Sequence, residues 1–369
     1  MKSKSKFAAV LQRVFGVILT AGFCLMLATF GEPSEPSPEA EKYSPLITAT
    51  LSPSPEPEYF TLSFIGDCTP AAAEGRKDQE NSYESVVAGD WQYPFSLTKD
   101  FFADDDFTFA NLECALTDAD YANTKAFMFR ADPEYSNILK EGGADFVTLA
   151  NNHILDCGEE GYRDTKTVLD ERGISYVGRN EYTIYETDSG LKIGIYGDSF
   201  TTKAKVQAGI AALKEGGAEL IIAALHWGDE GSYSVNDLQH ELGHAAVDSG
   251  AHFVYGSHPH TLQPHEEYNG GVIYYSLGNW TFGGNTVPRD PDTIILKLSV
   301  VRDTEGNVSI AGHDAIPCAF TGDRGGNDYR PKVYEVGSED YRRTLSKING
   351  TYSGPDLSIN YTYTIAELS

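Results

Sequence analysis

Short apolar runs alternate with helix-length segments along the chain from Tyr59 onward. The runs predict strands at 60–66, 107–112, 146–150, 192–197, 219–225, 252–256 and 272–277. Several are apolar at consecutive positions, as strands buried on both faces are. Helices are predicted at 133–142, 158–172 and 236–249, the first opening with Pro133 after Asp132. The alternation predicts an α/β sandwich, to which the segments 293–301 and 306–312 add antiparallel strands.

The N-terminal pattern is different and predicts an export signal over residues 1–31. Lys2, Lys4, Lys6 and Arg13 precede an apolar run from 14 to 30. This run is at the short limit for a membrane span, which needs about 20 residues. We favour a retained anchor, because no strong A-x-A cleavage site follows it. By the positive-inside rule the anchor would place the remaining chain outside the cytoplasm. The alternative is a cleaved signal and a secreted protein.

Composition divides the rest of the chain into three parts. Residues 32–58 are rich in Pro, Glu and Ser, which predicts an extended linker without a core. Residues 59–318 contain the predicted strands and helices and form the expected folded domain. Residues 319–369 are rich in Gly, Asp and Tyr, give weak signals, and are interpreted as a small C-terminal extension.

Charge and cysteine content narrow the class of partner. The formal net charge of the 369 residues is −26, which argues against a nucleic-acid partner unless metal ions mediate the contact. The five cysteines include no CxxC pair, which excludes a zinc ribbon. Four lie outside the N-terminal apolar run and are interpreted as buried apolar residues. A Cys68–Cys114 disulfide is the alternative outside the cytoplasm.

Polar residues follow six of the predicted strands, and this is where we expect the chemistry. Ligands bind outside the carboxyl ends of the strands in open α/β sheets, so these residues predict one shared site. Carboxylate, imidazole and amide oxygen suit Mn²⁺, Zn²⁺ or Fe. Each residue alone could instead be a turn or packing residue. The set consists of Asp67, Asn111, Glu113, Asn152, His153, His226, His258, His260 and Asn279.

A second histidine pair occurs on the predicted helix 236–249. His240 and His244 are four residues apart, which is a metal-ligand spacing on a helix. No Glu stands between them in the H-E-x-x-H order. We therefore interpret them as surface residues.

The strand-end blocks resemble the CapA family, the poly-γ-glutamate capsule-synthesis domain, over residues of about 60 to 318. The resemblance implies a calcineurin-like metallophosphoesterase fold, a four-layer αββα sandwich. The blocks that carry it are Phe64-Ile-Gly-Asp67, Asn111-Leu-Glu113, Ala150-Asn-Asn-His-Ile-Leu-Asp156-Cys-Gly158, His226-Trp-Gly228 with Glu230, Gly256-Ser-His-Pro-His260 and Tyr274-Tyr-Ser-Leu-Gly-Asn279.

The resemblance also implies a role for each residue in binding two divalent ions. Asp67 and His260 would bind the first metal, and Glu113 would take the place of the bridging Asp. Asn152, His226 and His258 would bind the second. His153 would be the general acid, a role worth about 10²–10⁴ in rate. Asn111, Glu230, Asn279 and Arg130 are the candidate substrate-binding residues.

Two departures from the metallophosphoesterase pattern limit this reading. The first motif of those enzymes is Asp-x-His, but here Asp67-Cys68 is followed by Thr69. The first metal therefore lacks one expected ligand. Glu113 is also longer than the Asp it replaces.

Three functions remain open from the sequence. The expected one is an anchored, extracytoplasmic hydrolase in which a metal-bound hydroxide cleaves a phosphoester or an amide in an anionic polymer or phosphoester substrate. The alternative is a non-catalytic polymer-binding, export or assembly factor that works with membrane synthase subunits. A metal-free binding module is the third. An anionic polymer would need bound metal or a local basic patch, for which the candidates are Lys125, Arg130, Arg324 and Arg330.

Overall fold

The computed structural model describes residues 56–322 and 325–357, which belong to one compact unit. The predicted anchor at 1–31 and most of the predicted linker at 32–58 lie outside the described residues. Among the residues that are described, no helix is long and apolar enough to cross a membrane.

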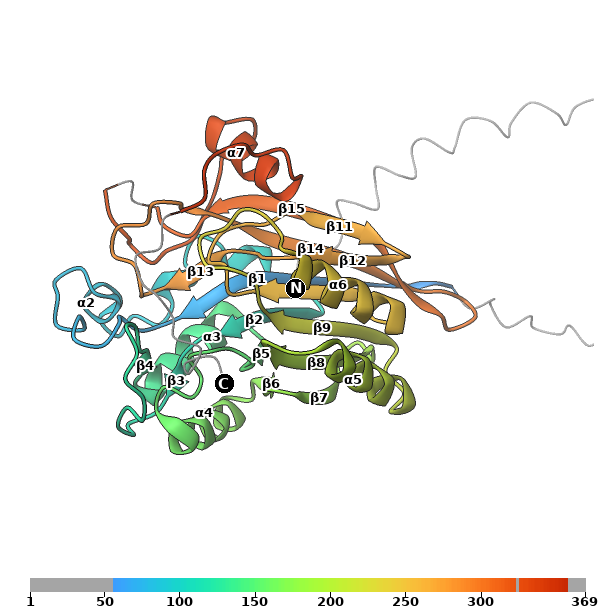
Figure 1. Ribbon diagram of the computed structural model, residues 1–369, viewed down its shortest axis with the longest axis horizontal. Helices are drawn as coiled ribbons and strands as arrows, with labels where there is room; N and C mark the ends of the chain where they lie inside the picture. Colours follow the sequence, from blue (N-terminus) through green and yellow to red (C-terminus); the bar gives the residue numbers. More distant parts are fainter. Residues whose placement is uncertain (1–55, 323–324, 358–369) are drawn as a thin grey trace, which may run out of the picture. The chain divides into compact units, whose positions relative to one another are not determined.

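Eight strands form the larger of two main sheets (Figure 1). Its centre is parallel: β1 (Glu58–Thr69) pairs with β2 (Phe107–Leu112), which pairs with β5 (Phe146–Thr148) and then β6 (Ser175–Val177). The other side of β1 is antiparallel, through β14 (Asp292–Arg302), β15 (Val308–Ala319) and β16 (Lys332–Val333). The end of β1 also pairs in parallel with β13 (Asn279–Phe282).

Six strands form the smaller sheet, in the order β11-β12-β10-β9-β8-β7. The four inner strands are parallel, and the two edge strands are antiparallel to their neighbours. Their bounds are β7 (Glu181–Glu186), β8 (Lys192–Ser199), β9 (Leu220–His226), β10 (Phe253–Ser257), β11 (His265–Tyr268) and β12 (Gly271–Tyr274). A separate two-stranded sheet joins β3 (Ala115–Leu116) to β4 (Arg130–Ala131).

The two main sheets pack face to face over an apolar core. Phe64, Phe109 and Phe146 from the larger sheet meet Tyr255 and Phe253 from the smaller one. Rings of Phe109 and Tyr255 lie edge to face, with centroids 4.9 Å apart. Aromatic side chains bury large apolar areas, so this layer supplies much of the hydrophobic stabilisation of the fold.

Helices cover the outer faces of both sheets and complete four layers. The larger sheet is covered by α2 (Tyr83–Val87), α3 (Ser136–Gly142) and α4 (Gly158–Arg172), with the 3₁₀ turns η1 (Tyr93–Phe95), η2 (Lys99–Phe101) and η3 (Pro133–Tyr135) nearby. The smaller sheet is covered by α5 (Lys203–Glu215) and α6 (Asp237–Ser249). The predicted αββα sandwich is therefore confirmed.

Local sequence signals explain where the helices begin and end. At the start of α6, Asn236 and Gln239 form a reciprocal capping box, in which each side chain accepts from the other's backbone N–H. The helix ends at Gly250, whose φ of 114° is unfavourable for other residues. The Thr202 hydroxyl oxygen caps α5 by accepting from the backbone N–H of Lys205.

Sequence and structure agree for most elements, with one correction that affects the site. The predicted strand 107–112 and helix 158–172 match the observed bounds. The predicted strand 272–277, however, ends at Tyr274, and Gly278 turns the chain with φ +69°. Asn279 therefore does not end that strand but begins β13, in the other sheet.

The segment predicted as a C-terminal extension packs against the larger sheet. Strand β15 crosses residue 318, and β16 extends the sheet beyond it. Helix α7 (Glu339–Ile348) lies against β14 and β15. It is fixed there by Lys347, whose buried ammonium lies 2.7 Å from carboxylates of both Asp290 and Asp292.

Candidate metal centre

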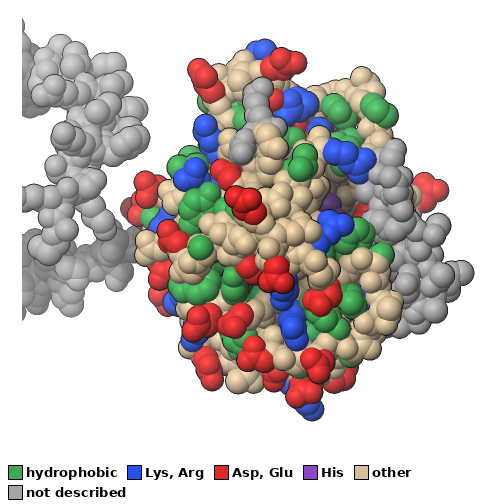
Figure 2. All heavy atoms as spheres, turned by 90° about the vertical axis from the view of Figure 1, so that its left-hand side faces the viewer, with side chains coloured by type: hydrophobic (Ala, Val, Ile, Leu, Met, Phe, Trp, Pro, Cys, Tyr) green, Lys and Arg blue, Asp and Glu red, His purple; other side chains and the backbone are tan. Residues whose placement is uncertain are grey.

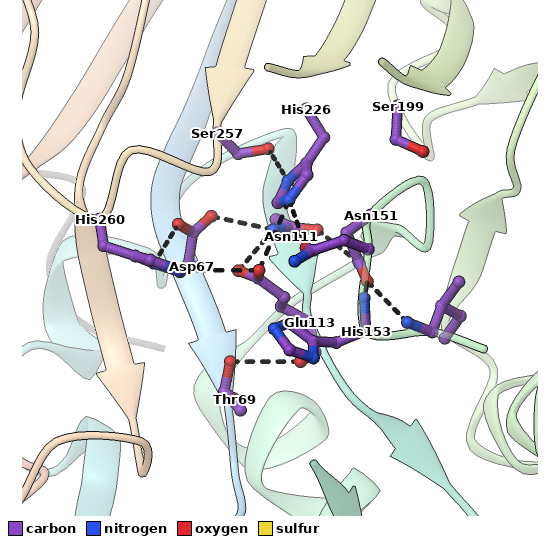
Figure 3. Close-up of polar contacts among 12 residues, drawn as sticks. Asp67, Thr69, Asn111, Glu113, Asn151, His153, Ser199, His226, Ser257 and His260 are labelled. Atoms are coloured by element: carbon purple, nitrogen blue, oxygen red, sulfur yellow. Dashed lines mark hydrogen bonds and ion pairs between the residues drawn. The ribbon is translucent and has the colours of Figure 1, made fainter. Parts of the chain in front are cut away.

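The strand-end residues converge where the two sheets meet (Figure 3). Asp67 and Asn111 are paired in register on β1 and β2. His226 and Ser257 are paired in register on β9 and β10. Because the parallel strands of each sheet end at this edge, one small volume receives side chains from both sheets.

Glu113 lies at the centre of the group and is fully buried. Its Oε1 is 3.5 Å from Nε2 of His226 and 3.8 Å from Nε2 of His260. Ligand atoms of Glu113, His258 and His260 all lie within 4.8 Å of one another. One carboxylate thus faces histidines from both halves of the site, which is the position that a bridging ligand needs.

Asp67 and His260 form the side of the site assigned to the first metal. Asp67 Oδ1 accepts from Asn111 Nδ2 at 2.9 Å. Its Oδ2 lies 3.1 Å from His260 Nδ1, but that nitrogen is hydrogen-bonded to Asn279 Oδ1 at 2.9 Å, so Oδ2 has no hydrogen-bond partner. Asn279 thus contacts a metal-ligand candidate rather than standing alone as a substrate residue.

The position of the missing histidine on this side is taken by Thr69. Its hydroxyl contacts the backbone carbonyl of Glu113 at 3.4 Å (Figure 3). A threonine bonded in this way does not replace an imidazole ligand. The shortage of ligands predicted for the first metal therefore persists in the folded protein.

His226, Asn152 and His258 form the other side. His226 Nε2 lies 2.8 Å from Asn152 Oδ1, and its Nδ1 lies 2.9 Å from Ser257 Oγ. The Ser257 contact fixes the ring so that Nε2 faces Asn152 and Glu113, as partners of metal-binding histidines do. The rings of His226 and His258 are 4.7 Å apart.

Three buried atoms in this cluster lack a hydrogen-bond partner: Asp67 Oδ2, Glu113 Oε1 and His258 Nδ1. A buried, unpaired polar atom costs about 1–3 kcal/mol, and more when it is charged. All three belong to residue types that bind divalent metals. The donor set therefore fits divalent ions that would satisfy these atoms together.

Burial and neighbouring charges shift the pKa values of the candidate ligands in different directions. Burial raises the pKa of Glu113 well above its usual value, with His260 opposing the rise and Asp67 adding to it. Burial alone would lower the pKa of His260, but Glu113 and Asp67 outweigh it and raise the pKa to about 10. Burial and the neighbouring histidines hold the pKa values of His226 and His258 well below normal. Neutral imidazoles of this kind have lone pairs ready for a metal.

His153 stands beside the ligand cluster and is held by a buried acid. Its Nδ1 lies 2.8 Å from Asp156 Oδ2, which also accepts the backbone N–H of Phe129. Asp156 Oδ1 is 3.0 Å from Lys125 Nζ. The Phe129 ring packs edge-on to His153 at 4.7 Å. These contacts fix the ring and direct its Nδ1–H to Asp156. The other ring nitrogen, Nε2, is therefore the one available to a group in the cavity.

Asn151 connects these groups although it is not itself a candidate ligand. Its amide donates to Asn111 Oδ1 and to the backbone carbonyl of Leu112. Its carbonyl oxygen accepts from the backbone N–H groups of His153 and Ile154. The turn that carries Asn152 and His153 is thereby tied to the end of β2.

The site opens into a cavity of about 330 Å³. Figure 2 shows this face, toward which β1 points in Figure 1, with a histidine visible in a hollow beside Lys or Arg side chains. The residues lining the cavity include His153, Glu230, His260, Asn279, Arg76 and Arg289. The two arginines, which no sequence pattern indicates, place positive groups beside the acids Glu230 and Asp290 in the lining of this cavity.

The predicted basic residues lie elsewhere or beneath the site. Arg130 is not among the described residues that line the cavity; its guanidinium binds the backbone carbonyl of Ala119. Arg330 lies over the ring of Tyr93. Lys125 supports Asp156, and Arg324 lies outside the described residues.

His258 and His260 have backbone conformations that are rare outside glycine, with φ values of +101° and +56°. Residues held in this way cost of order 1–3 kcal/mol and cluster at functional sites. The turn after β10 directs both rings toward Glu113, and the strained backbone lowers the stability of the fold.

The four described cysteines, Cys68, Cys114, Cys157 and Cys318, are buried and unpaired. Burial raises the pKa of the Cys68 thiol, so it is neutral beside Asp67. These cysteines pack as small apolar residues, as predicted, and the alternative Cys68–Cys114 disulfide is not formed.

The sequence analysis did not predict three features of the site: the His153–Asp156 pair, the Ser257 contact and the cavity arginines. A sequence pattern could have indicated the first two. His153 and Asp156 are three residues apart in one block, a spacing that allows the pair to meet in a turn. Ser257 directly precedes His258 at a strand end. No sequence pattern indicates the cavity arginines, because Arg76 and Arg289 are far apart in sequence and belong to loops.

Fold and site together define a two-sheet α/β protein with a histidine–carboxylate ligand set at its strand ends. The profile of a family described as bacterial capsule synthesis protein PGA_cap matches residues 61–200 and 183–284, and the chain belongs to this family. The predicted resemblance to CapA proteins is thereby confirmed.

Individual relatives agree with this assignment. The capsule biosynthesis protein CapA of Bacillus anthracis is 30% identical over 259 residues, which are 62% of this chain and 61% of that protein. The PGA biosynthesis protein CapA of Bacillus subtilis is 25% identical over 80% of each chain. Among solved structures, the Haemophilus influenzae NAD nucleotidase matches 80% of this chain and 63% of its own at 15% identity, with a TM-score of 0.38.

Proposed function

We propose that this protein is a metal-dependent hydrolase of capsule or poly-γ-glutamate biosynthesis that acts outside the cytoplasm on a phosphoester or amide bond of an anionic substrate. The observation that carries the proposal is the set of unpaired buried atoms on Asp67, Glu113 and His258, beside a histidine held by a buried acid. Ligand atoms and a proton donor facing one cavity are the parts that metal-assisted hydrolysis requires.

The ligand set divides between two ions. Asp67, Glu113 and His260 would hold the first, and Glu113, Asn152, His226 and His258 the second. Bound divalent ions polarise the scissile group and lower the pKa of water. The buried carboxylates supply the negative charge that retains the ions, and Asn111, Ser257 and Asn279 keep the ligands in place.

His153 protonates the leaving atom. Asp156 accepts the hydrogen bond from Nδ1–H and stabilises the charged ring, so Nε2 carries the transferable proton toward the cavity. The pair is buried and its geometry is supported by the Phe129 N–H and by Lys125. Little rearrangement is therefore needed before the proton is transferred.

Arg76 and Arg289 bind the anionic groups of the substrate. Both are exposed and line the cavity next to His153 and His260. The protein carries a net charge of −26 and repels polyanions at long range, so local cations are needed for encounter. Glu230, on the same cavity, restricts where a substrate carboxylate is accepted.

Extracytoplasmic action and membrane attachment rest on the basic and apolar pattern of residues 1–31. Association with membrane synthase subunits is part of the same proposal. The biosynthetic names of the Bacillus relatives support a role beside such a machinery.

One observation favours a second function, that of a non-catalytic assembly or export factor. Thr69 stands in place of a histidine, and the first metal is one ligand short. A site that holds one firm ion could anchor a polymer carboxylate without hydrolysing the chain. This function needs the ligands and the arginines but not His153.

The test uses the full chain in detergent. Bound metal is measured by mass spectrometry, and phosphoester and γ-glutamyl hydrolysis are assayed for wild type, His153→Ala and His258→Ala. His313→Ala serves as a control outside the site. Hydrolysis lost with metal retained in His153→Ala supports the enzyme. Metal without turnover in the wild type supports the assembly role, and no bound Mn²⁺, Zn²⁺ or Fe contradicts both.

A further inference from the structure

A second group of metal-ligand side chains lies on the outer face of the smaller sheet. His240 and His244 are one turn apart on α6, and Glu266 lies on the edge strand β11. One ligand atom from each lies within 4.8 Å of the other two. The group shares no residue with the strand-end site.

The distances within the group are close to those between ligands of one ion. His244 Nε2 lies 3.0 and 3.1 Å from the two carboxylate oxygens of Glu266. Two ligands of a tetrahedral Zn²⁺ are about 3.4 Å apart, given bonds of about 2.0–2.2 Å. His240 is farther, with Nδ1 at 3.7 Å from Glu266 Oε2, but its exposed side chain can rotate toward the other two ligands.

Two tyrosines, the buried Tyr275 and the partly exposed Tyr268, orient these ligands. The hydroxyl of Tyr275 donates to Glu266 Oε2 at 2.7 Å and lies 2.9 Å from His240 Nδ1. That tyrosine is itself buried and stacks on Trp227. The ring of His244 stacks on Tyr268 at 3.8 Å. Hydrogen bonds and packing around ligands are what distinguish a prepared site from a chance surface cluster.

We propose that His240, His244 and Glu266 form a separate site for one borderline divalent cation, with Zn²⁺ as the best match. Two imidazoles and a carboxylate are a ligand set that suits zinc. The side chains are 48%, 33% and 32% exposed, so water completes the coordination. His240 and His244 are surface residues, as the sequence predicts, and the proposal adds a metal-binding role to them.

An ion at this site would connect two elements that bracket the strand-end ligands. The chain between α6 and β11 contains β10, His258 and His260. An ion binding both ends of this segment stabilises the native state without touching the chemistry. The proposal is independent of hydrolysis.

The test measures Zn²⁺ and Co²⁺ binding to the full chain in detergent. Metal per chain is counted after equilibrium dialysis, and the visible absorption of Co²⁺ reports its coordination. The variants are His240→Asn with His244→Asn, Glu266→Gln, and Tyr275→Phe. The matched control is His313→Asn with Glu267→Gln, a histidine–glutamate pair 3.2 Å apart that joins β15 to β11.

We expect the double histidine variant to bind one ion fewer per chain than wild type, while the control is unchanged. Tyr275→Phe should weaken this ion about 10- to 100-fold, as loss of a supporting hydrogen bond does. Hydrolysis should persist in the double variant. Equal metal content in the double variant and wild type overturns the proposal. If His258→Ala loses bound metal and the double histidine variant does not, the proposal of a separate site is overturned, while the proposed strand-end site is supported.

Discussion

The protein contains two groups of candidate metal-ligand residues that differ in burial. In the strand-end site, Asp67 Oδ2, Glu113 Oε1 and His258 Nδ1 are buried without a hydrogen-bond partner, although His260 lies within ion-pair distance of both carboxylates. On the outer face, His244 and Glu266 are partly exposed and already paired with each other. An ion entering the first site would satisfy buried atoms that have no hydrogen bond in the described structure, whereas an ion entering the second must displace an existing contact and water.

This difference predicts very different affinities. Buried unpaired groups make the metal-free strand-end site costly, because their desolvation is not compensated. The exposed group has no such cost, because a surface pair is worth only about 0–1 kcal/mol. Residue type alone does not separate the two groups, since histidines and a glutamate occur in both. Burial separates them.

The largest effect should follow removal of the strand-end ions. Chelation, or His258→Ala, should abolish hydrolysis, because the ligand set is no longer complete. An ion present at 1,000 times its dissociation constant stabilises the fold by about 4 kcal/mol, so its loss should lower the melting temperature clearly. Calorimetry with and without chelator measures this. An unchanged melting temperature and activity after complete metal removal would contradict the buried site.

His153→Ala should come next in size. We expect kcat to fall by about 10²–10⁴ while the metal content stays constant, since His153 transfers a proton and is not a ligand. Steady-state kinetics and metal analysis on the same preparation measure both. If the ions disappear together with the activity, His153 belongs to the ligand set instead.

Ser257→Ala should have an intermediate effect confined to the strand-end site. Without the contact to Nδ1, the His226 ring is no longer held with Nε2 toward Glu113, and metal affinity should fall about 10- to 100-fold. Competition with a fluorescent chelator gives the affinity. Ser96→Ala is the matched control, because that hydroxyl bonds only a backbone carbonyl on an exposed turn. Equal affinities in both variants would show that Ser257 does not position the ring.

The smallest effect should be that of Glu266→Gln in the absence of metal. Loss of an exposed ion pair should lower the free energy of unfolding by at most about 1 kcal/mol. Chemical denaturation in chelator measures this value. A much larger loss would mean that Glu266 is needed for the fold itself, and the contrast between the two groups would be weaker than we infer.

The fold was predictable because its strongest signals are local. The apolar run 107–112 and the capped helix 158–172 match the structure to the residue. Asn279 was misplaced because 272–277 reads as one apolar run, and only the turn at Gly278 separates it from β13. Helix α5 had a readable signal in Val206, Ile210 and Leu213 after the cap Thr202, which the sequence analysis overlooked.

The convergence of the strand-end residues was predictable, but their connections were not. Residues at strand ends identify the candidate ligands, because parallel strands bring them to one edge. The partners of those ligands come from anywhere in the chain: Ser257 reaches His226 across 31 positions, and Asn279 reaches His260 across 19. Pairings of this kind depend on register between strands, which a single sequence does not encode in any local pattern.

The backbone of His258 has a consequence for how this family changes over time. At φ +101° a glycine would have a lower conformational energy than a histidine. The native residue therefore lowers the stability of the fold, and the proposed function gives it the role of a ligand. Selection for stability alone would replace it. We therefore expect that a relative that binds no ion could have glycine at the position of His258. On the proposed function, histidine at this position serves the ion rather than the stability of the fold.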